Sequence, residues 1–239
     1  MKILSVVLNH AKVHQNEFIR TDLIQKLLLT TGSGLISIFD PRRDDMISAF
    51  GELTGKNALP KIHKMMLGDV EARQILLDKP VINSTTINLN DLAKYPEQTF
   101  GRQYVDFLNA NNITPDSRKP VHFIEDPELA YVMRRYREIH DFTHCILGMK
   151  TNMIGEVTVK IFEAIQLGLP MCWLGGLFGI LRLGPKHTQQ YLDINLPWII
   201  NNASRSKPLI NVYFEKHFAK PIDQLRDELN LTVLIKPKK

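Results

Sequence analysis

Apolar residues recur three and four positions apart along much of the chain, which is the spacing of an amphipathic helix. The pattern is clear in Leu23–Leu28, Tyr104–Leu108 and Leu129–Tyr136. Alternation of apolar and polar residues, the mark of a half-buried strand, is rare. We therefore predict an all-α fold, with a single helical domain over residues 18–235.

Asp-Pro pairs mark two predicted helix starts, because Asp caps a helix and Pro suits its first position. Asp40-Pro41 predicts a helix to Gly55, and Asp126-Pro127 predicts a long helix through His144. The remaining expectations are helices near 60–67, 70–77, 99–109 and 222–229, connections at 79–96 and 110–122, C-terminal breaks at Pro197, Pro208 and Pro221, and a solvated tail at 236–239.

His140 and His144 are one helical turn apart and project to the same side of the predicted long helix. Asp141 lies about 100° further round, within reach of the same edge. Two imidazoles with one or two carboxylates suit a divalent cation. The alternative is a packed or solvated histidine pair, since spacing alone produces false matches.

Glu156 follows His144 by twelve residues, which on one straight helix would be about 18 Å. It can join the histidines only if the chain turns back. Gly148 can end the first helix, and Thr151 or Asn152 can cap a second. We therefore predict an antiparallel helix pair that carries the metal motif.

The composition is that of a globular protein with a mild positive charge. Hydrophobic residues make up 44% of 239, which is enough for a compact core. The net charge of +5 suits an anionic membrane surface or an acidic partner. No basic stripe with interleaved aromatic residues is present, so no nucleic acid is expected. The two cysteines, Cys145 and Cys172, exclude a disulfide framework, and Cys145 is either a packed residue or a soft ligand.

Three segments leave alternatives open. Residues 1–17 fit a short mitochondrial presequence, a disordered N-terminus or the first turns of the domain. The small residues of Thr30–Gly34 fit a bend or a close helix crossing. The apolar run 171–184 is too short to span a bilayer. It fits a buried segment whose Gly175, Gly176 and Gly179 allow close contact, or a surface for lipid.

The histidine motif resembles that of the Coq-four family of ubiquinone (coenzyme Q) biosynthesis. The family motif is H-D-x-x-H, eleven further residues and E, and His140, Asp141, His144 and Glu156 match its four positions. Other segments that resemble the family are Phe39–Met46, Gly51–Gly55, Thr99–Tyr104, Pro115–Val121 and Glu163–Met171. The resemblance covers about residues 18–235.

The resemblance implies an all-helical mitochondrial protein, attached peripherally to the matrix side of the inner membrane. It implies a carbon–carbon lyase that removes the C1 carboxyl of 4-hydroxy-3-methoxy-5-polyprenylbenzoate and leaves 2-methoxy-6-polyprenylphenol. Expected partners are other ubiquinone-biosynthesis enzymes in a multiprotein complex, polyprenylated benzoate and quinone lipids, and the membrane surface. A homodimer is left open.

We predict His140, Asp141, His144 and Glu156 as metal ligands. The family implies zinc, whereas the ligand types also suit iron, manganese or cobalt. Arg137 lies one turn before Asp141, so it either contacts the substrate carboxylate or is a solvated or salt-bridged arginine.

Three other functions remain open. One is an oxidative decarboxylase that also hydroxylates C1. Another is a non-catalytic lipid-binding scaffold that organises the complex. The third is a hydrolase, either with Asp141 as the general base or of an HD type that would need a further histidine such as His63 or His122.

Overall fold

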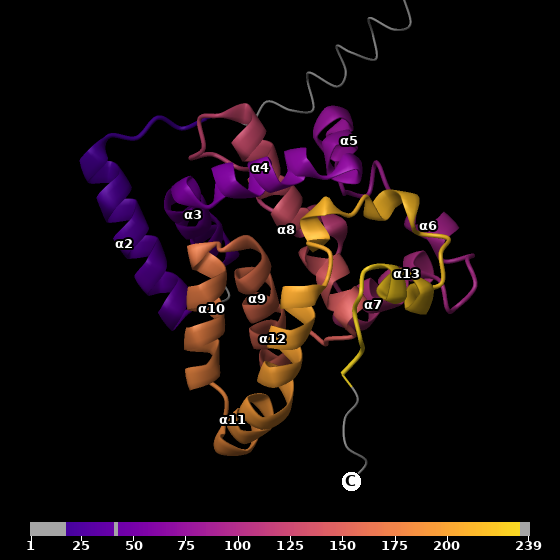
Figure 1. Ribbon diagram of the computed structural model, residues 1–239. Coiled ribbons are helices and arrows are strands. Elements are labelled where there is room, and N and C mark those ends of the chain that lie inside the picture. The colour runs from indigo at the N-terminus through magenta and orange to yellow at the C-terminus, as the bar shows by residue number, and fades with distance from the viewer. Residues whose placement is uncertain (1–17, 41–42, 235–239) are drawn as a thin grey trace, which may run out of the picture.

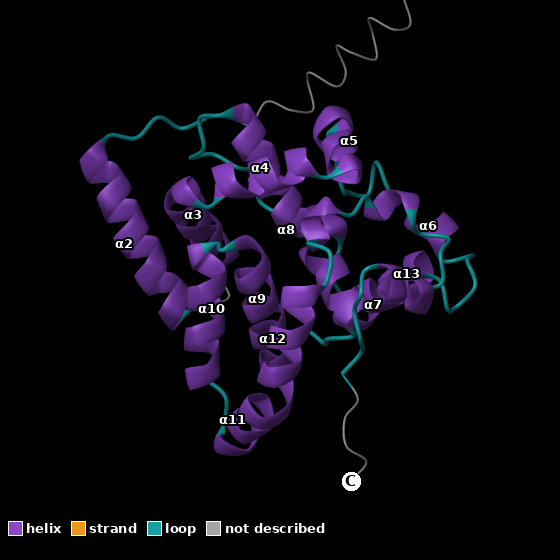
Figure 2. Cartoon of the chain, in the orientation of Figure 1, coloured by secondary structure: helices purple, strands orange, loops and turns teal. Residues whose placement is uncertain are grey.

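The computed structural model describes residues 18–40 and 43–234. Within these ranges the chain is helical and forms no strand, only one isolated bridge between Thr99 and Pro221 (Figure 2). The predicted all-α fold is confirmed. The expectations for residues 1–17, Pro41 and the tail 236–239 lie outside the described residues.

Two irregular connections, residues 79–88 and 118–126, interrupt the series of helices (Figure 1). The first part of the chain forms α2 Leu23–Phe39, α3 Asp44–Thr54, η1 Gly55–Asn57, α4 Leu59–Gly68, α5 Val70–Asp78, α6 Leu89–Leu92, α7 Phe100–Asn111 and η2 Pro115–Ser117. The rest forms α8 Pro127–Leu147, α9 Met153–Leu167, α10 Pro170–Leu181, α11 Pro185–Gln190, η3 Tyr191–Asn195, α12 Leu196–Arg205, η4 Leu209–Asn211, η5 Phe214–Lys216 and α13 Ile222–Glu228.

Helix α8 lies at the centre of the molecule (Figure 1), and nearly all of its residues from Ala130 onward are buried. It packs against α4, α7 and α9. Its start is as predicted: the Asp126 side chain accepts from the backbone N–H groups of Glu128 and Leu129, and Pro127 is the first helical residue. A helix buried on all sides must pair its polar side chains with groups on its neighbours.

Two predicted boundaries differ from the structure. The helix expected from Pro41 begins at Asp44, which with Asp45 places acidic side chains at its positive end. Pro197 does not break a helix, because it lies at the start of α12. The π-helical turn η3, immediately before it, widens the backbone where the ring of Pro197 would otherwise meet a carbonyl.

Small residues allow two close helix crossings. Gly34, inside α2, faces the ring of Phe50 on α3, so Thr30–Gly34 is a crossing and not a bend. On α10, a Cβ at Gly176 would lie 2.3 Å from Ile161 and one at Gly179 would lie 2.4 Å from Val157, both on α9. One face of the apolar run is therefore buried against α9.

The other face of α10 is exposed, as are most apolar residues of α2. The side chains concerned are Leu23, Ile24, Leu27, Leu28, Leu35, Ile36 and Phe39 on α2 and Trp173, Leu177 and Leu181 on α10. The two helices meet at their C-terminal ends, where Arg182 Nη2 donates to the carbonyl of Phe39. Among the described residues, no helix has both the length and the apolar character to cross a bilayer.

Gly155, the residue before Glu156, has no room for a side chain. A Cβ there would lie 1.9 Å from the backbone oxygen of Lys150, which has no room to move without shifting the connection before α9. We expect Gly155→Ala to lower the free energy of unfolding by about 2–3 kcal/mol, measured by urea denaturation.

Gly32→Ala is the matched control, since a Cβ at this position of α2 meets nothing within 4 Å. It should stabilise the protein by about 0.5–1 kcal/mol through helix propensity. Equal stability of the two variants would contradict the close approach at Gly155.

Candidate metal centre

His140 and His144 lie in the last turns of α8, and Glu156 lies in the first turn of α9. Gly148, with a φ of 65°, ends α8 in the left-handed conformation that glycine adopts without strain. Asn152 accepts from the backbone N–H of Gly155 and caps α9. The short connection between these caps brings Glu156 back to the histidines.

The three side chains form one cluster of donor atoms. His140 Nε2 lies 3.6 Å from Glu156 Oε2, and His144 Nε2 lies 3.4 Å from Glu156 Oε1. Their ligand atoms all lie within 4.8 Å of one another, and the part of the chain that the structure describes contains no other such group of three. A third histidine near the pair, which an HD-type hydrolase would need, is absent from this group.

The Nδ1 atoms of both rings already have hydrogen-bond partners. His140 Nδ1 lies 2.6 Å from Glu163 Oε1, and His144 Nδ1 lies 3.2 Å from the carbonyl oxygen of Met149. With a cation at Nε2, both of these groups would accept a hydrogen bond from a protonated Nδ1, so that each Nε2 lone pair would point toward the cation.

A divalent cation fits this arrangement. His144 Nε2 is buried and has no hydrogen-bond partner among the described residues, a state that costs free energy unless a ligand fills it. Two imidazole nitrogens and one carboxylate are a common donor set for a metal with an open position. The side chain of Glu156 is 37% exposed, so the cluster can be reached from solvent.

A second layer of buried polar groups lies behind His140. Lys160 Nζ donates to Glu163 Oε2 at 2.9 Å and to the Tyr136 hydroxyl at 3.0 Å. That hydroxyl also donates to Glu163 at 3.0 Å and lies 3.1 Å from Cys172 Sγ. Burial raises the pKa of Cys172 to about 12, so its thiol stays neutral.

The carboxylates near the histidines stay ionised despite their surroundings. Burial alone would raise the pKa of Glu156, but the neighbouring imidazoles of His140 and His144 lower it well below its usual range. For Glu163, the charges of His140 and Lys160 outweigh burial and lower the pKa to about 2. Ionised carboxylates are the form that binds a cation.

Asp141 lies apart from the other three predicted ligands. Its buried carboxylate accepts from Nη2 of the partly exposed Arg118, and it is not a member of the donor cluster. Cys145 is also outside the cluster and is buried, as expected of a packed residue.

Arg137 is held away from the cluster. Its Nη2 donates to Glu52 at 2.8 Å and to the carbonyl of Ser48 at 2.7 Å, and its side chain is only 7% exposed. The structure therefore places it in a buried salt bridge between α8 and α3.

Several polar residues around the cluster were missed from the sequence: Tyr136, Lys160, Glu163 and Arg118. Lys160 and Glu163 follow Glu156 by four and seven residues, so they share its face of α9. That spacing could have found them. Nothing in the sequence indicates that Arg118, on a loop, meets Asp141.

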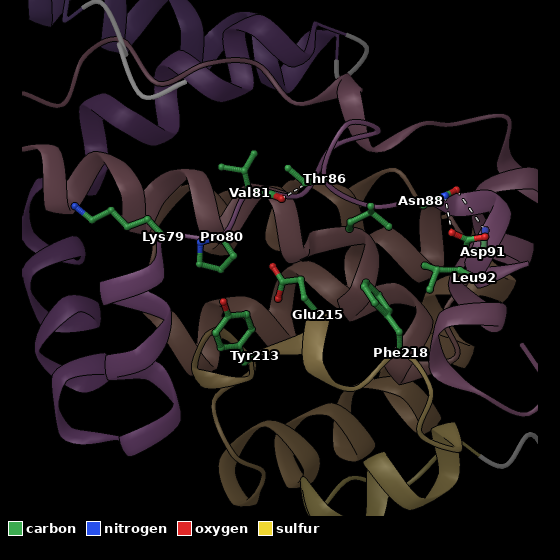
Figure 3. A pocket seen from close by; sticks show the side chains of 11 residues that line it. Lys79, Pro80, Val81, Thr86, Asn88, Asp91, Leu92, Tyr213, Glu215 and Phe218 are labelled. Carbon is green, nitrogen blue, oxygen red and sulfur yellow. Dashed lines mark hydrogen bonds between the residues drawn. The ribbon is translucent and has the colours of Figure 1, made fainter. Parts of the chain in front are cut away.

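A cavity of about 480 Å³ lies elsewhere, between α5, α6 and η5 (Figure 3). Its lining includes Pro80, Leu92, Tyr213, Glu215 and Phe218, with no member of the donor cluster. Glu215 pairs with Arg135 of α8. The cavity is therefore separate from the donor cluster, and Glu215 links its lining to α8.

Fold and site together define an all-helical protein with a candidate two-histidine, one-glutamate metal centre. The chain belongs to the family of the coenzyme Q (ubiquinone) biosynthesis protein Coq4, whose model matches residues 15–234. Its role is therefore in ubiquinone biosynthesis.

Insect relatives are similar over nearly the whole chain. The mitochondrial ubiquinone biosynthesis protein COQ4 homolog of Bombyx mori is 53% identical, over 93% of this chain and 86% of the relative. The homolog of Aedes aegypti is 50% identical, over 91% and 81%. A solved crystal structure from Nostoc punctiforme superposes with a TM-score of 0.69 over 88% of this chain and 98% of the other, at 19% identity, which shows the shared fold.

If Glu163 orients the ring of His140, then Glu163→Gln should weaken zinc binding about 10- to 100-fold, because a neutral amide supports the imidazole less well. His144→Ala should weaken it more. The measurement is competitive zinc titration against a chromogenic chelator, with unfolding monitored in parallel. His187→Ala, an exposed histidine of α11, is the control and should leave the affinity unchanged. If Glu163→Gln binds zinc as tightly as wild type, Glu163 does not support the metal centre.

Proposed function

We propose that this chain is a metal-dependent decarboxylase of ubiquinone biosynthesis. Its substrate would be 4-hydroxy-3-methoxy-5-polyprenylbenzoate, which loses the C1 carboxyl as CO2 to give 2-methoxy-6-polyprenylphenol. One observation carries the proposal: the Nε2 atoms of His140 and His144 face the carboxylate of Glu156 in a chain of the Coq4 family.

The cluster would be the metal-binding part of the active site. A divalent cation such as zinc, bound by His140, His144 and Glu156, would supply positive charge for an anionic oxygen of the substrate. Glu163 and the carbonyl of Met149 hold the two rings in place. Rings that are already oriented need no reorganisation when the substrate binds.

The reaction breaks the bond between C1 and the carboxyl carbon, and a proton takes the place of the carboxyl group on C1. In the proposal this proton comes from the ammonium group of Lys160. Lys160 carries a proton at Nζ, 3.0 Å from the Tyr136 hydroxyl, and both belong to the layer behind His140. A positioned acid of this kind contributes about 10²- to 10⁴-fold to a rate.

The exposed apolar face offers a path for the polyprenyl tail. A Cβ at Gly175 of α10 would lie 3.6 Å from the side chain of Lys160, so α10 passes close to the polar layer. Trp173 and Leu177 lie on the same helix and are exposed. A tail along α10 would leave the ring near the donor cluster.

We propose further that the protein works at the matrix face of the mitochondrial inner membrane, as a peripheral protein. The insect relatives are named mitochondrial, and the exposed side chains of α2 and α10 suit the interface of a bilayer. The net charge of +5 favours anionic headgroups. Other ubiquinone-biosynthesis proteins would be its partners there.

The decisive assay follows CO2 release from a short-prenyl 4-hydroxy-3-methoxybenzoate by purified protein of known metal content, with and without oxygen. We expect release by wild type and by His187→Ala, and a loss of about 10³-fold or more in His144→Ala. The last variant must remain folded by circular dichroism.

The outcomes separate the candidate functions. Release that does not need oxygen supports the lyase, whereas strict oxygen dependence with a hydroxylated product supports the oxidative decarboxylase. A folded, metal-loaded protein that binds the substrate without turnover would reject the enzyme in favour of the scaffold.

Membrane attachment predicts a second measurement, by flotation with vesicles of phosphatidylcholine and cardiolipin. Leu177 of α10 is 54% exposed and Leu77 of α5 is 78% exposed. We expect Leu177→Glu to reduce the bound fraction, because a charge would enter the bilayer interface, and Leu77→Glu to leave it unchanged. The same loss in both variants would contradict the assignment of this face.

A further inference from the structure

Asp141 is adjacent to His140 but forms an ion pair with Arg118. Its buried carboxylate accepts from Arg118 Nη2, while the other three motif side chains gather in the donor cluster. A buried carboxylate that faced no cation would be costly. The pair therefore places a guanidinium from the loop after η2 beside the histidine-bearing turn of α8.

Most donors of Arg118 are free for a ligand. A guanidinium carries five N–H groups, and the only hydrogen bond of this one to a described residue is the bond from Nη2 to Asp141. Nε is buried without a partner, and the side chain as a whole is 32% exposed. Arg118 is thus anchored at one nitrogen, and part of its side chain stays accessible to solvent.

Neighbouring carboxylates stabilise the charged form of Arg118. Burial alone would lower the pKa of Arg118, but the carboxylates of Asp141, Glu156 and Glu163 raise it above its ordinary value. Its ion pair with Asp141, the residue next to His140, places the guanidinium beside the turn of α8 that carries the histidines. It can therefore act on the same ligand as the cluster.

Helix α7 adds an unpaired donor and an aromatic face to this region. The Tyr104 hydroxyl is fully buried and has no hydrogen-bond partner among the described residues, and the Tyr104 ring lies 4.5 Å, centroid to centroid, from the ring of Phe142, which follows Asp141. Phe107, one turn further on, stacks on His144 with ring centroids 5.8 Å apart. A charged fork, a hydroxyl donor and an aromatic ring together suit a planar aromatic acid.

Arg137, the arginine that the sequence suggested for the substrate carboxylate, lacks these properties. Both of its terminal nitrogens already have acceptors, namely Glu52 and three backbone carbonyls, and it is almost fully buried. Binding a ligand would require breaking this salt bridge, which is costly in the interior.

We propose that Arg118 binds the carboxylate of an aromatic carboxylic acid at the donor cluster, and that Asp141 is the positioning residue that holds Arg118 there, not a metal ligand. The inference rests on the proposed function for its substrate class. In this assignment Asp141, the second residue of the motif, acts on the bound acid through Arg118. The other three, His140, His144 and Glu156, bind the metal.

The test compares two probes on the zinc-loaded full chain by isothermal titration calorimetry: 4-hydroxy-3-methoxybenzoate, and 2-methoxyphenol, which lacks the carboxylate. Arg118→Gln should weaken binding of the benzoate about 10- to 100-fold and leave the phenol unchanged. Arg118→Lys, which keeps the charge without the planar fork, should fall between. Arg102→Gln, which breaks an exposed pair with Asp106 on α7, should change neither.

Asp141→Asn separates a positioning residue from a ligand. We expect zinc affinity close to that of wild type, benzoate binding weakened, and little further loss in the double variant Arg118→Gln/Asp141→Asn. The double variant leaves no unpaired buried charge, so it also serves if Arg118→Gln alone fails to fold.

Two results would overturn the inference: loss of zinc in Asp141→Asn comparable to that in His144→Ala, or benzoate binding that is unchanged in Arg118→Gln and in the double variant. Failure of the proposed function is distinguishable from either. Arg118-dependent binding of the benzoate without CO2 release would retain this inference and reject the decarboxylase.

Discussion

The contact of one carboxylate with two buried imidazoles is the constraint on which the centre of this protein depends. Glu156 can face His140 and His144 only because the chain reverses between α8 and α9. The reversal requires a left-handed residue at Gly148 and no side chain at Gly155, where the backbone of the connection passes. Local backbone geometry is thus coupled directly to the donor cluster.

Helix α8 shows how a buried helix can carry many ionisable groups. Arg135 pairs with Glu215, Arg137 with Glu52, Asp141 with Arg118 and His140 with Glu163, each on a different neighbouring segment. Removing one partner leaves a buried charge, which is strongly destabilising. These pairs fix the rotation of α8 against its surroundings and, with it, the direction of both histidines.

Helix α10 connects the polar centre to the surface. Its glycines let it approach α9 closely, while Trp173, Leu177 and Leu181 remain exposed on the other side. A single helix therefore borders both the layer around Lys160 and an apolar face. A substrate with a polar ring and a long apolar tail matches this combination in chemistry.

The sequence by itself determined the helical class, the Asp126 cap, the reversal signals and the spacing that gathers His140, His144 and Glu156, because all of these are local. It did not determine that η3 would carry the helix past Pro197, or that Arg137 would be bound by Glu52. The partner of Asp141 was equally out of reach, since Arg118 lies 23 residues earlier on a loop. The packing of the helices decides which charged residues of distant segments form ion pairs. The periodicity of the sequence describes single helices and does not predict these pairs.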